Sequence, residues 1–178
     1  MTGERVGAII GGGFGTAFVL INAGELPPPW PPLTWLLGLG MAAASLRLII
    51  VGQSSRTGAR PPRSALHVYA ISVIAEVLAI PAGAIALRAV DSAELTMTWV
   101  TFVVGVHFLP FAHAFGRQHF LVLGWLLIAL AVGGSGMAVT VGVGWARVAA
   151  VIAGFVLLGF SMFADRGPTG TRHWVVNN

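Results

Sequence analysis

The chain has 178 residues, of which 56% are apolar and only 9% are charged, with a formal net charge of +4. Soluble domains carry about 25% charged residues, so this composition excludes an ordinary water-exposed surface and favours one that faces lipid. The lack of cysteine excludes disulfides and thiolate metal sites, and the ten arginines form no continuous basic face that would indicate nucleic-acid binding.

Six long apolar stretches follow one another along the chain and predict six membrane-spanning helices. Their approximate bounds are residues 6–23, 33–51, 65–87, 95–115, 120–136 and 140–163. Most approach or exceed the roughly 20 residues that cross a hydrocarbon core about 30 Å thick. No strand-like alternation of apolar and polar residues competes with these stretches. We therefore expect an all-α integral membrane bundle that forms a single transmembrane domain over residues 1–178.

The first stretch contains the run RVGAIIGGGFGT, which is open to two interpretations. An apolar run before a glycine cluster can begin a dinucleotide-binding turn, but no second strand follows and Glu25 comes too early for the ribose-binding acid. Gly7, Gly11 and Gly15 instead lie four residues apart, as two overlapping small-xxx-small motifs on one helical face. We interpret them as a helix-packing seam, and the stretch as a first span rather than a cleaved signal peptide.

Short polar or proline-rich joints separate the six stretches. The proline-rich joint 26–32 cannot continue a helix, because proline lacks the amide hydrogen. The joint 54–64 carries arginines and two prolines, 91–94 is short and acidic, and 117–119 is tight enough to require an antiparallel hairpin. The glycine-rich segment 133–136 predicts a turn between the fifth and sixth stretches.

Arginines predict the orientation of the chain. If the N-terminus is cytoplasmic, the inner segments hold Arg5, Arg56, Arg60, Arg63, Arg117, Arg166 and Arg172. The outer side then holds Arg88 and also Arg147, which we place at the interface rather than inside the sixth span. Tryptophans are typical of membrane interfaces, and four fall near the outer boundary, namely Trp30, Trp35, Trp99 and Trp145. Both termini are therefore expected in the cytoplasm.

Glu76 lies halfway along the third stretch, about 16 Å from either end at 1.5 Å per residue. A carboxylate at this depth is costly in lipid, so it must face the bundle interior, stay protonated or find a partner. Tyr69, Ser72 and Glu76 follow a three-then-four spacing, which places them on one helical face. Pro81, five residues further, frees the carbonyl of Val77. We expect a polar stripe that runs from the cytoplasmic side to the midplane.

His107 occupies a similar depth in the fourth stretch, three residues before Pro110. A short joint links the third and fourth stretches, so the two helices are expected to pack antiparallel and to bring Glu76 and His107 together. Two interpretations stay open: a proton-linked or ligand-binding pair, and a hydrogen-bonded pair that fixes helix register. Asn22, near the outer end of the first stretch, is a further candidate for the polar site.

His67 and His113 form a second constellation, because each lies a few residues from the cytoplasmic end of its stretch. Two such imidazoles can ligate a b-type haem iron, but two interfacial histidines wetted by headgroup water are the interpretation we favour. We therefore expect no cofactor. The sequence has no Ser-His-Asp arrangement, His-Glu-x-x-His motif, P-loop or paired carboxylates, which favours a protein that is not an enzyme.

Three stretches of the chain resemble a group of small, uncharacterised bacterial multi-pass integral membrane proteins. They are GAIIGGGFGTAFVLINA at 7–23, YAISVIAEVLAIPA at 69–82 and WVTFVVGVHF at 99–108. The mid-span Ala75-Glu76-Val77 and the segment 105–108 are the most specific parts. The resemblance implies a hydrophobic six-span helical bundle in the bacterial plasma membrane, and it brings no activity with it.

The leading functional hypothesis is a small transporter or channel-like protein, with a proton-responsive site at Glu76 and His107. Tyr69 and Ser72 would line its cavity, between the first, third and fourth spans. The alternative is a non-catalytic assembly or interaction subunit that uses glycine seams as docking faces, in a homo-oligomer or with a membrane partner. A haem electron carrier is the third hypothesis. In every case we expect a lipid bilayer and no nucleic acid as partner.

Overall fold

The computed structural model describes residues 3–51, 63–115 and 118–163, and nearly all of them are helical. The helices are α1 (Gly3–Ala23), α2 (Trp30–Val51), α3 (Arg63–Ala89), α4 (Thr96–Phe115), α5 (Gln118–Thr140) and α6 (Gly144–Phe163). A short 3-10 helix, η2 (Ala93–Leu95), precedes α4. Because these described ranges contain helices and no strand, the predicted all-α fold is confirmed.

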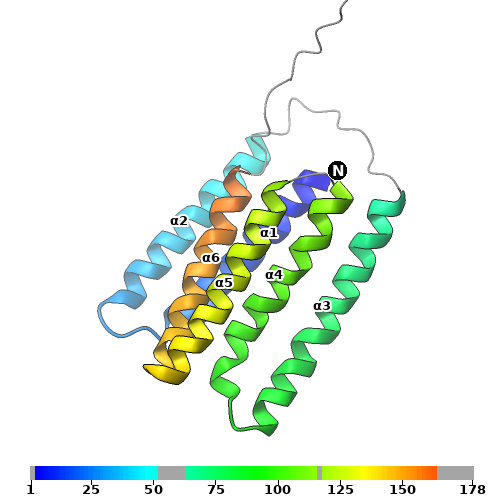
Figure 1. Ribbon diagram of the computed structural model, residues 1–178. Helices are drawn as coiled ribbons and strands as arrows, with labels where there is room; N and C mark the ends of the chain where they lie inside the picture. Colours follow the sequence, from blue (N-terminus) through cyan, green and yellow to red (C-terminus); the bar gives the residue numbers. More distant parts are fainter. Residues whose placement is uncertain (1–2, 52–62, 116–117, 164–178) are drawn as a thin grey trace, which may run out of the picture.

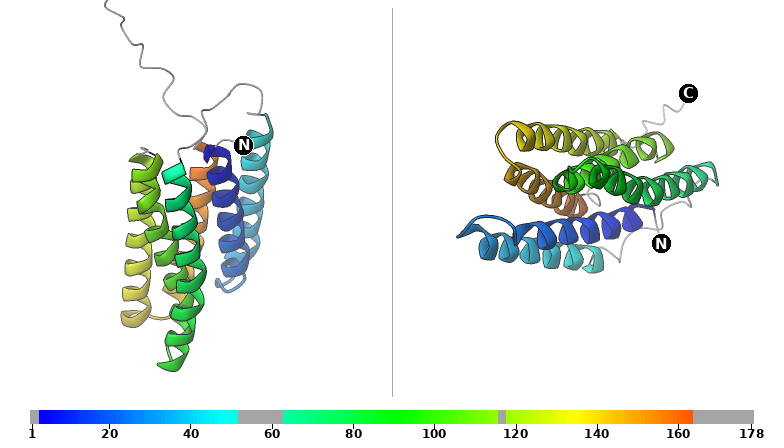
Figure 2. Two further views of the ribbon diagram at one scale, coloured as in Figure 1. Left: turned by 90° about the vertical axis from the view of Figure 1, so that its right-hand side faces the viewer. Right: turned by 90° about the horizontal axis from the view of Figure 1, so that it is seen from below.

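Successive helices run in opposite directions and form one bundle (Figure 1). α4 and α6 contact each other, and α5 packs against both. α1 lies against α6, and α2 packs against α1 and α6. α3 packs chiefly against α4, at an edge of the bundle (Figure 2). The alternation brings the start of α1 and the end of α6 to the same end, called the N-terminal end below.

Five of these helices, α2 to α6, are long and apolar enough to cross a membrane, and the apolar part of α1 at Ile9–Ala23 is shorter. Large apolar side chains cover the outside of the bundle: Leu36 of α2 is 71% exposed, Ile85 of α3 68% and Val139 of α5 76%. Each such side chain would be stabilised by about 1.5–3 kcal/mol if it were removed from water. An outer surface of this kind is typical of a membrane protein.

Glycines let the helices approach closely where they cross. A Cβ atom added to Gly15 of α1 would lie 2.7 Å from the carbonyl oxygen of Gly154 in α6. α4 and α5 cross in the same way, since a Cβ on Gly105 would lie 2.9 Å from the carbonyl oxygen of Gly124. Lipid supplies no hydrophobic force between helices, so close backbone contact of this kind stabilises them through van der Waals packing.

The predicted glycine seam of α1 faces α6 over the part that the structure describes. Gly11 and Gly15 are both buried there, and a Cβ on Gly11 would lie 3.7 Å from the carbonyl oxygen of Leu157. The surroundings of Gly7 lie outside the described residues. Beside the seam, the hydroxyls of Ser45 in α2 and Ser161 in α6 are hydrogen-bonded at 2.6 Å. The seam therefore holds helices of the same chain together.

The predicted turn at 133–136 is wrong, because α5 continues through these glycines to Thr140. Gly134 is buried against α6, where an added Cβ would collide with the Cβ of Ala149. Glycine costs a helix only about 1 kcal/mol relative to alanine, and the close packing against α6 offsets that cost. The fifth span therefore ends later than residue 136, and the sixth helix begins at Gly144 rather than at residue 140.

The turn between α5 and α6 lies at residues 141–143. The carbonyl of Met137 accepts hydrogen bonds from the amides of Val141 and Gly142, at 2.8 and 3.1 Å, which closes the end of α5. Gly142 has a φ of 151°, a backbone conformation that residues other than glycine rarely adopt. A single glycine with a required backbone angle, and not the glycine-rich segment before it, marks the turn.

α2 begins three residues earlier than predicted, at Trp30. The two prolines that follow Trp30 occupy the first turn of the helix, where no amide hydrogen is needed for an intrahelical bond. Proline therefore starts this helix, although it was expected to exclude residues 26–32 from any helix. The remaining helix boundaries differ from the predicted spans by a few residues each.

Arg147 lies in the first turn of α6, at the end of the bundle opposite the N-terminal end. Its Nη2 atom is 3.6 Å from Oε2 of Glu25, just after α1, and the two side chains are 39% and 62% exposed. Trp145, two residues earlier, is also exposed. This position fits the interfacial interpretation. Of the orienting arginines, Arg56, Arg60, Arg117, Arg166 and Arg172 lie outside the described residues, as do the side chains of Arg5 and Arg63.

The seam between α1 and α6 predicts that alanine is destabilising at one glycine of α1 and tolerated at another. Gly15→Ala places a methyl group against the backbone of α6 and should destabilise the protein by about 1–3 kcal/mol. Gly13→Ala is the matched control, because a Cβ there meets no atom within 4 Å. Thermal unfolding in detergent micelles measures both. Equal midpoints for the two variants would contradict the α1–α6 contact.

Candidate functional site

Glu76 and His107 meet in the middle of the contact between α3 and α4. Nδ1 of His107 lies 3.1 Å from Oε2 of Glu76, and the two side chains are 6% and 10% exposed, respectively. Glu76 is midway between the ends of α3, about 20 Å from each at 1.5 Å per residue. The short joint between the antiparallel helices explains the meeting, because both residues stand at a similar distance from it along the chain.

The pair can hold a proton on either partner. Nδ1 of His107 is buried and, within the described part of the chain, has no hydrogen bond of good geometry, although Glu76 is within ion-pair distance. A neutral imidazole has one donor and one acceptor nitrogen, whereas an imidazolium has two donors. A protonated carboxyl group can donate to Nδ1, and an ionised one can accept from it. Both arrangements use the same two atoms.

Aromatic rings surround the imidazole of His107. The ring of Phe111 is 4.5 Å away between centroids and tilted by 61°, and Phe108 packs edge-on at 5.6 Å. Tyr69 of α3 stacks on Phe111 at 5.5 Å. Phe108 and Phe111 also belong to the buried cluster in the centre of the bundle. Packing therefore fixes the orientation of the imidazole toward α3.

Three of the predicted site residues lie on the face of α3 that contacts α4. Glu76 reaches His107, Tyr69 packs at the edge of the buried cluster and Ser72 is buried. Ile74, between them in sequence, is 60% exposed and points away from α4. The expected three-then-four stripe is thus present, and it begins near the N-terminal end of the bundle.

Asn22 is not brought to this site. It is buried in the last turn of α1, where its Nδ2 donates a hydrogen bond to the carbonyl of Phe18 at 2.8 Å. α1 packs chiefly against α2 and α6. The predicted cavity between the first, third and fourth spans therefore has no support from the helix contacts, and the Glu76–His107 pair belongs to the α3–α4 contact.

Sequence reasoning missed a second polar contact between α3 and α4. Trp99 was expected only to mark the membrane boundary, but its Nε1 donates a hydrogen bond to the carbonyl of Ala79 at 3.0 Å. Gly83, one turn further along α3, provides the space, since an added Cβ would collide with the indole of Trp99. The contact supports α3 beside Pro81, which lies inside the helix. In the sequence, the feature that could have indicated this close contact is Gly83, a glycine within an apolar stretch.

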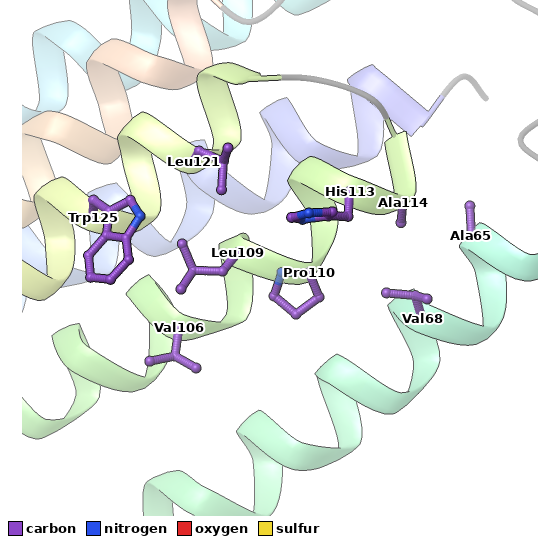
Figure 3. Close-up of a pocket in the computed structure, with 9 residues that line it drawn as sticks. All are labelled: Ala65, Val68, Val106, Leu109, Pro110, His113, Ala114, Leu121 and Trp125. Carbon is purple, nitrogen blue, oxygen red and sulfur yellow. The ribbon is translucent and has the colours of Figure 1, made fainter.

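His67 and His113 both lie near the N-terminal end and both are exposed. His113 lines a pocket between α3, α4 and α5, whereas His67 is not part of the lining (Figure 3). Over the described ranges, no three histidine, aspartate or glutamate residues gather as a metal site would need. The haem hypothesis stays a prediction. The pocket itself was not foreseen, although Val106, Pro110 and His113 follow a helical spacing along one face of the fourth stretch.

Comparisons of the chain with family models, with curated proteins and with solved structures found no match. The resemblance of residues 7–23, 69–82 and 99–108 to small bacterial membrane proteins stays a prediction. The functional interpretation therefore rests on the geometry and chemistry of the residues themselves.

The Glu76–His107 contact predicts strong coupling between the two side chains. Glu76→Leu or His107→Leu alone leaves a buried polar partner without its neighbour and should lower stability. The double variant removes both polar groups and should lose less than the sum of the single losses, with a coupling of about 0.5–3 kcal/mol. Thermal unfolding of the four proteins in micelles measures the cycle. Strictly additive losses would contradict direct contact.

Proposed function

We propose that the chain is a small transporter or channel-like protein of the bacterial plasma membrane, and that the Glu76–His107 pair is its proton-responsive group. The observation that carries the proposal is the 3.1 Å contact between a carboxylate and an imidazole in the middle of two long apolar helices. Intramembrane ionisable residues are rare and commonly mark ion or proton pathways.

In the proposed topology the bundle spans the membrane six times, with both termini in the cytoplasm. The alternating helices support this topology, because they bring the start of α1 and the end of α6 to the same end (Figure 1). The sequence concentrates its arginines in the joints and terminal segments at that end, as the positive-inside rule requires of cytoplasmic segments. Arg147 and Glu25 then mark the outer interface.

The cost of burial supports a functional role for the pair. Replacing a buried ion pair by apolar residues is often neutral or stabilising, so an acid and an imidazole at this depth are not needed for packing alone. The stripe of Tyr69 and Ser72 offers hydroxyl groups between the N-terminal end and Glu76. α3 packs chiefly against α4, at the edge of the bundle, so a small displacement of this one helix would open the pair.

The alternative of a pure assembly subunit receives less support. It relied on glycine seams as free docking faces, but Gly11 and Gly15 pack against α6 of the same chain. Gly105 and Gly124 likewise pack against each other within the bundle. These seams are used to build the protein, whereas the Glu76–His107 pair contributes chemistry that packing does not require.

Proton movement into proteoliposomes tests the proposed role of Glu76. Vesicles that contain the protein and the pH-sensitive dye pyranine receive an inward proton gradient, with potassium and valinomycin to cancel the membrane potential. The wild-type protein should acidify the lumen several-fold faster than protein-free vesicles do. Glu76→Gln should return the rate to that of protein-free vesicles, because the amide of glutamine neither gains nor loses a proton near neutral pH.

Glu94→Gln is the matched control, since Glu94 is an exposed acid in η2 outside the long helices. Glu94→Gln should conduct protons as the wild-type protein does. The rate of His107→Asn should lie between the rates of the wild-type protein and of Glu76→Gln. Undiminished proton movement in Glu76→Gln would overturn the assignment. So would a wild-type protein that moves protons no faster than empty vesicles.

A further inference from the structure

The face of α3 that contacts α4 differs in polarity on the two sides of Glu76. Toward the N-terminal end, Ser72 lies four residues from Glu76 and Tyr69 seven, and both carry a hydroxyl group. Toward the opposite end, residues 77–87 read VLAIPAGAIAL and contain no polar side chain. A hydroxyl group can donate and accept hydrogen bonds, as a proton route requires, whereas an apolar side chain can do neither. The side chains of α3 therefore offer a polar route to the pair from the N-terminal end alone.

The indole of Trp99 fills the contact between α3 and α4 on the apolar side. Its Nε1 donates a hydrogen bond to the carbonyl of Ala79 at 3.0 Å. Ala79 is three residues from Glu76 in α3, about 4.5 Å along the helix axis. The backbone of Trp99 is likewise three residues from the start of α4 at Thr96. The indole thus occupies the interval between the pair and the end of the bundle opposite the N-terminal end.

Three contacts hold the indole in this place. The first is the hydrogen bond to Ala79, which is partly buried, so breaking it leaves two polar groups unpaired. The second is with Gly83, where an added Cβ would collide with the ring. The third is with Phe102 of α4, whose ring stacks on the indole at 5.8 Å between centroids and 24° between planes. Residues of both α3 and α4 therefore fix the position of Trp99.

The two buried threonines of α4 on this side of the pair form hydrogen bonds elsewhere. Thr98 donates its hydroxyl to the carbonyl of Leu95 at 2.8 Å, and it accepts a hydrogen bond from Ser135 of α5 at the same distance. Thr101 donates to the carbonyl of Met97 within α4 at 2.8 Å. These hydroxyl groups serve α4 itself, η2 and α5, so they do not extend a polar route along α3.

We propose that Trp99 is the barrier on the outer side of the Glu76–His107 pair. With the indole against Gly83, the pair exchanges protons with the N-terminal end only, and the outer route opens when the indole moves away. An apolar constriction of this kind blocks ions by excluding water. α3 packs chiefly against α4, so a displacement of α3 is sufficient to release the indole. The inference rests on the proposed function, because it describes how the same pair is reached.

Trp99→Ala tests the barrier in the pyranine assay, because it removes the indole and leaves the carbonyl of Ala79 free to bind water. The variant should acidify the vesicle lumen about three- to tenfold faster than the wild-type protein, as the loss of one hydrogen bond from the closed state allows. Trp99→Ala combined with Glu76→Gln should return to the rate of protein-free vesicles, because the proton still has to pass the pair.

Gly83→Ala tests the same barrier without removing any atom. The added methyl group would collide with the indole and displace it, so this variant should also move protons faster than the wild-type protein. Trp99→Phe refills part of the space but lacks the N–H donor, so its rate should lie between those of the wild-type protein and of Trp99→Ala. These two variants keep the test decisive if Trp99→Ala does not fold.

Trp35→Ala is the matched control. Trp35 lies near the start of α2, at the same end of the bundle as Trp99, and its Nε1 donates a hydrogen bond to the carbonyl of Leu20 at 3.3 Å. This contact joins α2 to α1 and is separate from the contact between α3 and α4. Trp35→Ala should therefore move protons at the wild-type rate.

Wild-type rates in both Trp99→Ala and Gly83→Ala would overturn the barrier and leave the proposed function standing. A fast rate that persists when Trp99→Ala is combined with Glu76→Gln would also overturn it, since the protons would then bypass the pair. If the wild-type protein moves protons no faster than empty vesicles but Trp99→Ala does so through Glu76, the proposed function fails and the barrier stands. If neither protein moves protons, both proposals fail.

Discussion

A carboxylate in the middle of an apolar helix is the constraint on which the arrangement of α3 depends. The side chain of Glu76 is almost fully buried, and its Oε2 atom lies 3.1 Å from Nδ1 of His107. The short joint through η2 makes α3 and α4 antiparallel and sets the register in which these two side chains meet. Trp99, hydrogen-bonded to the carbonyl of Ala79, strengthens the same register closer to the joint. One edge helix is thus held to the bundle by polar contacts as well as by packing.

α4 connects the polar pair to the rest of the bundle and to the pocket between α3, α4 and α5. On one side His107 packs with Phe111 into the buried aromatic cluster. On another side Val106, Pro110 and His113 line the pocket between α3, α4 and α5. The tight crossing at Gly105 and Gly124 fixes α4 against α5, which leaves α3 as the helix with the fewest constraints. Movement of α3 would alter the pair and the pocket together.

The number and type of helices followed from hydropathy alone, and the depth of Glu76 and His107 was enough to predict their meeting. The helices depend on the hydropathy of each residue, and the meeting of Glu76 and His107 depends on the reversal of chain direction between α3 and α4. The turn at 133–136 was wrong because the packing of Gly134 against Ala149, which keeps α5 helical, joins residues of two different helices. The same reason explains why the sequence did not reveal the Trp99–Ala79 hydrogen bond or the pocket. A cavity between three helices depends on which side chains become neighbours in space, and a pattern along the sequence does not specify those neighbours.

The contact between Glu76 and His107 can be measured directly in a bilayer by solid-state NMR. Labelling the carboxyl carbon of glutamate with ¹³C and the imidazole nitrogens of histidine with ¹⁵N gives a dipolar coupling between the two side chains. We expect a strong coupling, as the 3.1 Å separation of Oε2 and Nδ1 requires, that disappears in Glu76→Gln. The lack of this coupling in the wild-type protein, or its persistence in the variant, would contradict the central role of the pair.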